Sequence, residues 1–162
     1  MRRRHAPTPA TIATPLQASV VLSGSGVNWQ NRGCSFSLDP SHINALAPGK
    51  RPRLTPSPAL AVAPGRFVLP FGTPGGDVQL QAMAQVLLNM LLFGMDPQDA
   101  VEHPRVASYS FPDSFEPHEE LAGRLCIEGR IPSAIGDALA ARGHKVTWWP
   151  ERIWRAGAVC TI

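Results

Sequence analysis

The sequence has few cysteines, almost no lysine and no long apolar run. Its three cysteines are an odd number and show no Cys-x-x-Cys spacing, which excludes a disulfide framework and a zinc site, so we expect them to be small buried side chains. No apolar run reaches the ~20 residues of a membrane-spanning helix. The basic start, MRRRHAPTP, lacks the apolar stretch that follows in a secretory signal, and the sequence does not distinguish a cytoplasmic from a periplasmic location.

Basic residues are not arranged for nucleic-acid binding. The net charge is +3, and Arg2, Arg3 and Arg4 together equal that excess. The remaining arginines are scattered without interleaved aromatic residues, whereas nucleic-acid-binding proteins carry a basic face or stripe. The five histidines are not spaced as metal ligands. We therefore expect neither a nucleic-acid partner nor a bound metal.

Hydrophobic periodicity predicts one layered α+β domain. Residues 1–15 are rich in proline and threonine and are predicted to be disordered or a non-native start. A long proline-containing connection follows the second predicted strand, and residues 106–117 are expected to be irregular. Strands are predicted at 18–22, 27–38 (broken at Gly33), 59–63, 66–71, 125–128, 145–149 and 158–162, and the turn Pro64-Gly65 joins the third and fourth of these. Helices are predicted at 77–93, 96–102 and 132–142, and the second of these starts with Asp96 as N-cap and Pro97 at the first helical position.

The helix at 77–93 has the strongest pattern. Asp77 stands where an N-cap would lie. A narrow polar stripe is formed by Gln81, Gln85 and Asn89 at i, i+4 spacing, and the rest is apolar. We expect this helix to be packed on most sides and the strands before it to form a buried sheet.

The segment GTPGG at 72–76 joins a predicted strand to this helix. Such a junction leaves backbone N–H groups unpaired near the positive end of the helix dipole. Gly75 and Gly76 carry no side chain, so a phosphate or a developing oxyanion could approach the backbone closely. The spacing matches neither a P-loop nor the dinucleotide fingerprint. A tight structural turn without a ligand is the other interpretation of this stretch.

Four motifs follow one another along the chain, namely NALAPGKRPRLTPSPAL (44–60), FGTPGGDVQLQAMAQVLLN (71–89), FGMDPQDAVEHPR (93–105) and GRIPSAIGDALAARGHKV (129–146). The chain resembles the small C-terminal subunit of the gamma-glutamyltransferase family over residues 16–162. The resemblance implies part of an αββα N-terminal-nucleophile hydrolase sandwich, in which a self-cleaving precursor exposes a threonine that attacks the acyl donor, with its own amine as base. It implies transfer of a γ-glutamyl or related acyl group to water or an amine, without a cofactor.

The resemblance also assigns roles to residues around the GTPGG segment. Gly75 and Gly76 match the glycine pair whose N–H groups form the oxyanion hole. Thr55 matches the second of two hydroxyl residues that contact the substrate carboxylate, and Leu54 replaces the first. Thr73, within GTPGG, is expected to contribute to substrate binding.

A further set of expected substrate contacts departs from the family pattern. Asn31 falls on a family asparagine, but Arg32 replaces a glutamine. Ser35 stands where the glutamyl enzymes place an aspartate that pairs with the donor's α-amino group. Loss of that charge-assisted hydrogen bond costs roughly 1.5–3 kcal/mol, so we expect altered donor specificity.

The expected nucleophile has no counterpart in this sequence. Thr8, Thr11 and Thr14 lie in a Pro/Ala tract without a strand pattern. By comparison with the family we expect truncation at both ends, a large subunit as partner, and a fragment that is inactive alone. The alternatives are a small subunit that works with a separately encoded chain and a non-catalytic anion-binding module.

Two further expectations concern packing. Arg105, which closes the third motif, is expected to form an ion pair that braces the subunit rather than to act in catalysis. Three tryptophans are expected in the core or at an interface, namely Trp148, Trp149 and Trp154.

Overall fold

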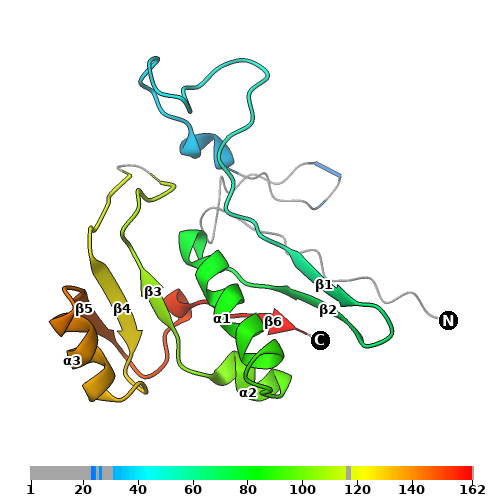
Figure 1. The fold of residues 1–162 in the computed structure, drawn as a ribbon. Coiled ribbons are helices and arrows are strands. Elements are labelled where there is room, and N and C mark those ends of the chain that lie inside the picture. The colour runs from blue at the N-terminus through cyan, green and yellow to red at the C-terminus, as the bar shows by residue number, and fades with distance from the viewer. Residues whose placement is uncertain (1–22, 25, 27–30, 116–117, 162) are drawn as a thin grey trace.

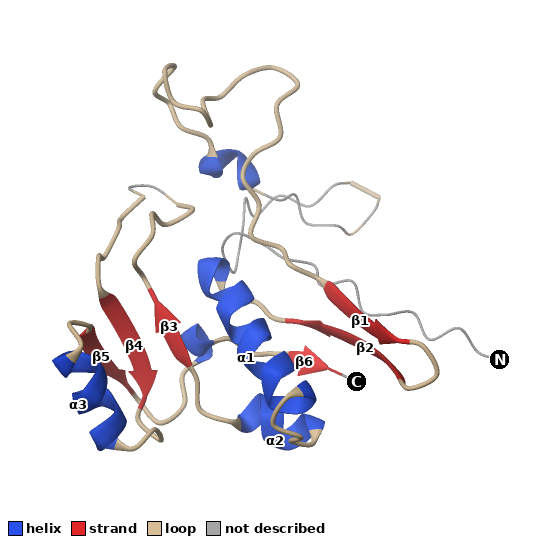
Figure 2. Ribbon diagram, in the orientation of Figure 1, coloured by secondary structure: helices blue, strands red, loops and turns tan. Residues whose placement is uncertain are grey.

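The computed structural model describes residues 23–24, 26, 31–115 and 118–161. Within these ranges two three-stranded sheets lie on either side of a central helix, α1 (Figures 1 and 2). None of the helices in these ranges has the length and apolar character needed to cross a membrane. The predictions for residues 1–15 and 18–22, and the threonines at 8, 11 and 14, fall outside the described residues.

The first sheet has the order β1-β2-β6. Strands β1 (Ala59–Ala63) and β2 (Phe67–Gly72) form the predicted hairpin, and β2 also pairs with the short β6 (Cys160–Thr161). Burial alternates along β1, because successive side chains point to opposite faces. The prediction of a buried sheet is wrong for one face of the hairpin, since the described residues leave its apolar side chains exposed, namely Leu60, Val62 and Val68.

The second sheet has the order β3-β4-β5. Strands β3 (Val106–Ser108) and β4 (Arg124–Glu128) are antiparallel, and β4 is parallel to β5 (Lys145–Trp149). Helix α3 (Ser133–Ala141) is the crossover that parallel pairing requires. The expectation that residues 106–117 are irregular is therefore wrong over β3.

The central helix begins later than predicted. A 3₁₀ turn, η2 (Gly76–Val78), precedes α1 (Gln79–Leu91), and Asp77 caps neither, because its carboxylate bonds to Ser114. The next helix, α2 (Pro97–Glu102), does have its predicted cap, with Asp96 accepting from two backbone amides. The buried cluster around α1 consists of Val78, Ala82, Met83, Val86, Ala100, Ala107 and Val159.

The glutamine stripe of α1 binds the outer edge of β3. Gln81 exchanges a pair of hydrogen bonds with the backbone of Ser108, at 2.8 and 3.0 Å. Gln85 does the same with Val106, at 2.9 and 3.0 Å. The side chains thus replace a neighbouring strand and satisfy an edge that would otherwise need water or another chain. One flank of α1 is not packed as expected, because Leu80, Leu88 and Leu91 are exposed in the described structure.

The segment before β1 is a long loop that projects from the two sheets (Figure 1). It contains the 3₁₀ turn η1 (Arg32–Ser35) in place of the predicted strand, of which residues 27–30 are outside the described ranges. A single bridge joins Ser37 to Ala45. Burial of the cysteines is confirmed only for Cys126, because Cys34 and Cys160 are exposed.

Candidate functional site

The glycine pair has a backbone conformation that other residues avoid. Gly75 has φ 136° and Gly76 has φ 58°, so a side chain at either position would strain the backbone. Both lie between the end of β2 and the 3₁₀ turn that leads into α1. Among the described residues, no hydrogen bond uses the amide of Gly75 or Gly76. The loop therefore presents two adjacent N–H donors that are open to a ligand.

A crossing segment at Gly157 fixes this loop from one side. Gly157 follows the 3₁₀ turn η3 (Trp154–Ala156), and its Cα would lie 3.9 Å from a Cβ placed on Gly75. Thr73 Oγ1 accepts a hydrogen bond from Ala158 N at 2.8 Å and donates to Pro74 O at 2.7 Å. The hydroxyl of Thr73 thus holds the loop in shape, and its expected role in substrate binding stays a prediction.

Asp77 fixes the same loop from the other side. Its carboxylate accepts hydrogen bonds from the buried Ser114, from the backbone N at 2.7 Å and from Oγ at 2.5 Å. These bonds hold the next residue, Phe115, against the glycines, with its ring carbon Cε2 3.8 Å from where a Cβ of Gly76 would be. The Arg32 guanidinium lies over the same ring, 6.0 Å from its centroid. Phe115 therefore brings the η1 turn close to the glycine pair.

Thr55 is connected to the glycine loop through Gln79. With its amide oriented to satisfy both acceptors, the Gln79 nitrogen donates to Thr73 O at 2.9 Å and to Thr55 O at 3.1 Å. The structure thus brings Thr55, Thr73 and the glycines together, and it places Asn31, Arg32 and Ser35 on one turn. The sequence analysis missed Ser114 and Phe115, because no pattern in the SFPDSF segment indicates that it folds over the glycines.

Several expected substrate contacts have buried polar atoms without a partner. Asn31 Oδ1, Ser35 Oγ and Thr55 Oγ1 are buried and accept or donate no hydrogen bond among the described residues. Ser35 is fully buried and Thr55 is 8% exposed. A buried polar group left without a partner costs about 1–3 kcal/mol, so such groups are usually satisfied by a ligand, water or further protein.

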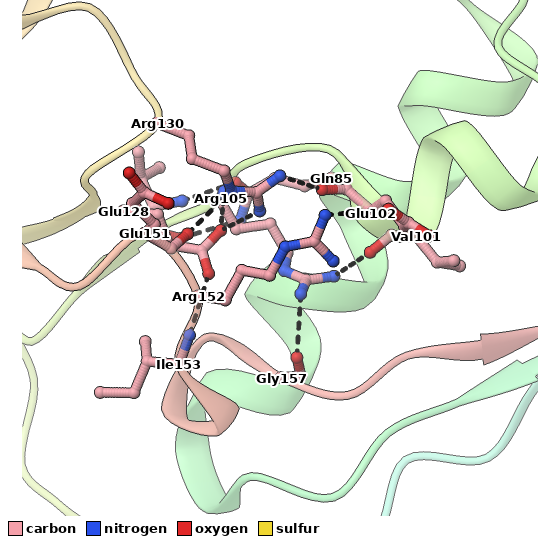
Figure 3. A network of polar contacts seen from close by, with 11 residues as sticks. Gln85, Val101, Glu102, Arg105, Glu128, Arg130, Glu151, Arg152, Ile153 and Gly157 are labelled. Carbon is pink, nitrogen blue, oxygen red and sulfur yellow. Dashed lines mark hydrogen bonds and ion pairs between the residues drawn. The ribbon is translucent and has the colours of Figure 1, made fainter.

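Arg105 lies in a network of polar contacts that reaches Gly157, the residue next to the glycine loop (Figure 3). Its guanidinium donates to Val101 O and Gly157 O, each at 3.0 Å, and its backbone N donates to Glu128 Oε2 at 2.8 Å. The expected brace is thus present, but through carbonyls rather than an ion pair. Glu128 forms its ion pair with Arg130 instead, at 3.1 Å. Desolvation lowers the pKa of Arg105, and Glu128 opposes that shift.

Replacing Glu128 by glutamine is expected to lower the local free energy of opening of β4 by about 2 kcal/mol, the cost of losing hydrogen bonds to a charged group. The carboxylate is 1% exposed and also accepts from Ile153 N at 3.4 Å. Amide hydrogen exchange of β4 and β5 measures the change. Glu102→Gln is the control, because its pair with Arg152 is exposed, and it should change exchange much less. Equal effects of the two substitutions would contradict the role given to Glu128.

The tryptophans do not share one environment. Trp149 packs edge-on against Tyr109, with ring centroids 6.3 Å apart. Trp148 is 43% exposed and closely contacts Gly136, where any Cβ would overlap its ring. Trp154 is 67% exposed, so it does not lie in the core of the described structure, and its packing at an interface stays a prediction. It lines a pocket of about 210 Å³ that borders Gly75 and Gly76.

Comparisons with known proteins agree with the resemblance seen in the sequence. The gamma-glutamyltranspeptidase family model matches residues 8–162. The oxamate amidohydrolase proenzyme of Klebsiella pneumoniae is 36% identical over 146 residues, which are 88% of this chain and 26% of the relative. The glutathione hydrolase-like YwrD proenzyme of Bacillus subtilis is 35% identical over 130 residues, 80% of this chain and 23% of the relative. The chain spans about a quarter of the length of these curated relatives.

Solved structures give the same fold. The cephalosporin acylase of Bacillus halodurans matches with a TM-score of 0.64 at 32% identity, covering 88% of this chain and 24% of that chain. The gamma-glutamyltranspeptidase of Pseudomonas nitroreducens matches with a TM-score of 0.70 at 25% identity, covering 94% of this chain and 79% of that chain. These matches confirm the predicted α+β class and the N-terminal-nucleophile hydrolase fold. The chain belongs to the gamma-glutamyltranspeptidase family of glutathione hydrolases and acylases.

Proposed function

We propose that the described residues around the glycine loop form the oxyanion hole and one wall of the donor pocket of an enzyme. This enzyme transfers an acyl group from an amide to water or to an amine. The observation that carries this proposal is the pair of open N–H donors at Gly75 and Gly76. Attack on an amide carbonyl makes its oxygen negative, and neutral N–H donors stabilise that oxygen without a counterion. The Asp77 carboxylate next to the loop disfavours a phosphate, so a developing oxyanion is the better occupant.

The nucleophile is proposed to come from outside the described residues. The hydroxyl of Thr73 is already engaged with Pro74 and Ala158. The family resemblance implies a threonine that uses its own free amine as base. The exposed apolar faces of the β1–β2 hairpin and of α1 support contact with further protein, and the large subunit of the same precursor is the partner that we propose.

The donor is proposed to lack an α-ammonium group. Ser35 is fully buried and carries no negative charge to pair with an ammonium. An ammonium group at this place would therefore lose its water without gaining a charged partner, which is costly. The names of two relatives, an oxamate amidohydrolase and a cephalosporin acylase, support donors other than γ-glutamyl amides.

The donor class predicts a preference between two matched anilides. Glutaryl-p-nitroanilide differs from γ-glutamyl-p-nitroanilide only by the missing α-ammonium group. We expect kcat/KM to be at least about tenfold higher for the glutaryl compound, because burying the γ-glutamyl ammonium without a partner costs about 1–3 kcal/mol or more. Ser35→Asp should move the preference toward γ-glutamyl.

The assay should use the polypeptide that carries these residues in the cell, isolated with an antibody against α3. Release of p-nitroaniline with the glutaryl preference would support both the reaction and the donor class. A γ-glutamyl preference would overturn the donor class alone. Phosphate binding to a folded polypeptide that cleaves no anilide would favour an anion-binding module over an enzyme.

A further inference from the structure

The pocket beside the glycine pair has aromatic walls. Its volume is about 210 Å³, and it is bordered by Gly75 and Gly76 and by the rings of Tyr109, Phe111, Phe115 and Trp154. Burial raises the pKa of the Tyr109 phenol, so this ring stays uncharged at ordinary pH. The volume is below the roughly 300–1,000 Å³ of a whole-ligand site, so the pocket fits part of a substrate.

The charged groups of the pocket are mostly acidic. Asp77, Asp113 and Glu119 line it, against the single guanidinium of Arg155. The Asp77 oxygens bind Ser114 and Arg53, and one Asp113 oxygen accepts from Phe115 N at 2.8 Å. Glu119 is exposed and makes no side-chain hydrogen bond within the described ranges. Aromatic faces combined with carboxylates attract organic cations, because the ring face and the carboxylate are both negative.

We propose that this pocket binds the amine portion of the substrate, as an organic ammonium ion with a small aromatic or alkyl group. This assignment rests on the proposed acyl transfer, and it specifies where the amine side of the cleaved amide binds. Hydrolysis of an amide by water gives a carboxylate and a protonated amine. The glycine N–H groups bind the oxygen that becomes negative, and the adjoining acidic, aromatic pocket binds the nitrogen side that becomes positive. The developing negative oxygen thus meets N–H donors, and the departing amine meets carboxylates and aromatic faces, at neighbouring places in the site.

Direct binding to the full chain tests this assignment without requiring turnover. The probes are benzylammonium, the neutral benzyl alcohol and the anionic benzoate, which share one ring and differ in charge. We expect affinity to fall in that order, with benzylammonium up to about fivefold tighter than benzyl alcohol, the upper end of the range for an exposed ion pair. The signals that shift in the NMR spectrum should be the Trp154 indole and the amides of Gly75 and Gly76. The preference for the cation should weaken as salt rises.

Two matched charge substitutions distinguish the effect of a carboxylate in the pocket from the effect of the net charge of the protein. Glu119→Gln should remove most of the preference for benzylammonium over benzyl alcohol. Glu120→Gln makes the same change of net charge at an exposed residue that does not line the pocket, and it should leave the preference nearly unchanged. Equal effects of the two variants, tighter binding of benzoate, or shifts away from Trp154 would overturn the proposal. Failure of the anilide assay with the expected binding order would remove the acyl-transfer function but leave the cation pocket. Anilide cleavage without that binding order would remove the cation pocket but leave the acyl-transfer function.

Discussion

Replacing Gly157 by alanine is expected to lower the local free energy of opening around α1 and β6 by about 4 kcal/mol, from overpacking and backbone strain together. The added Cβ would lie 2.6 Å from the Cβ of Ala82, in the buried face of α1, and 3.3 Å from Thr73 Oγ1. The backbone of Gly157, at φ 92° and ψ 149°, is close to a region that glycine alone occupies readily. The crossing segment must therefore move, and the hydrogen bond from Ala158 to Thr73 should be lost with it.

Gly143→Ala is the matched control for this substitution. Gly143 also has a positive φ, 97°, but no atom lies within 4 Å of the position that its Cβ would take. Its replacement should show the backbone strain without the clash. Amide hydrogen exchange of α1 and of residues 158–161 measures both variants. Similar exchange in the two would contradict the view that Gly157 is a close-packing position behind the glycine loop.

Local patterns in the sequence were sufficient for most elements. The turn Pro64-Gly65 between two apolar runs predicted the β1–β2 hairpin, and Asp96-Pro97 predicted the start of α2. In both cases the signal lies within a few neighbouring residues, where backbone preferences decide the structure. The glycine pair was likewise found from its position between a strand and a helix, and the structure gives both residues positive φ angles.

Contacts between distant segments could not be predicted in this way. Asp77 has the residue type and position of an N-cap, but Ser114 lies 37 residues away and competes successfully for its carboxylate. The stripe of Gln81 and Gln85 was visible as a pattern, whereas its partner, the outer edge of β3, was not predicted as a strand. Phe115, which covers Gly76, lies in a segment without hydrophobic periodicity. The sequence therefore indicated the glycine pair that we propose as oxyanion donors, but not the residues that hold the pair in place.

Removing the N–H group of Gly76 is also expected to have a large effect. Exchanging the residue at position 76 for glycolic acid turns the Gly76 amide into an ester, which removes one N–H and adds no side chain. Loss of one oxyanion-hole donor costs about 2.7–4 kcal/mol of barrier, or roughly 100- to 1,000-fold in kcat. KM should change much less, because the donor acts mainly on the negative oxygen of the transition state. The same exchange at Gly65, in the exposed β1–β2 turn, should leave kcat unchanged.

The most direct test of the account is therefore kcat for glutaryl-p-nitroanilide with the ester at position 76, in the polypeptide that carries these residues in the cell. The account predicts a fall of at least about 100-fold with a nearly unchanged KM, while the ester at position 65 behaves as the parent. An unchanged kcat, or an equal fall for both esters, would contradict the assignment of Gly75 and Gly76 as the oxyanion hole.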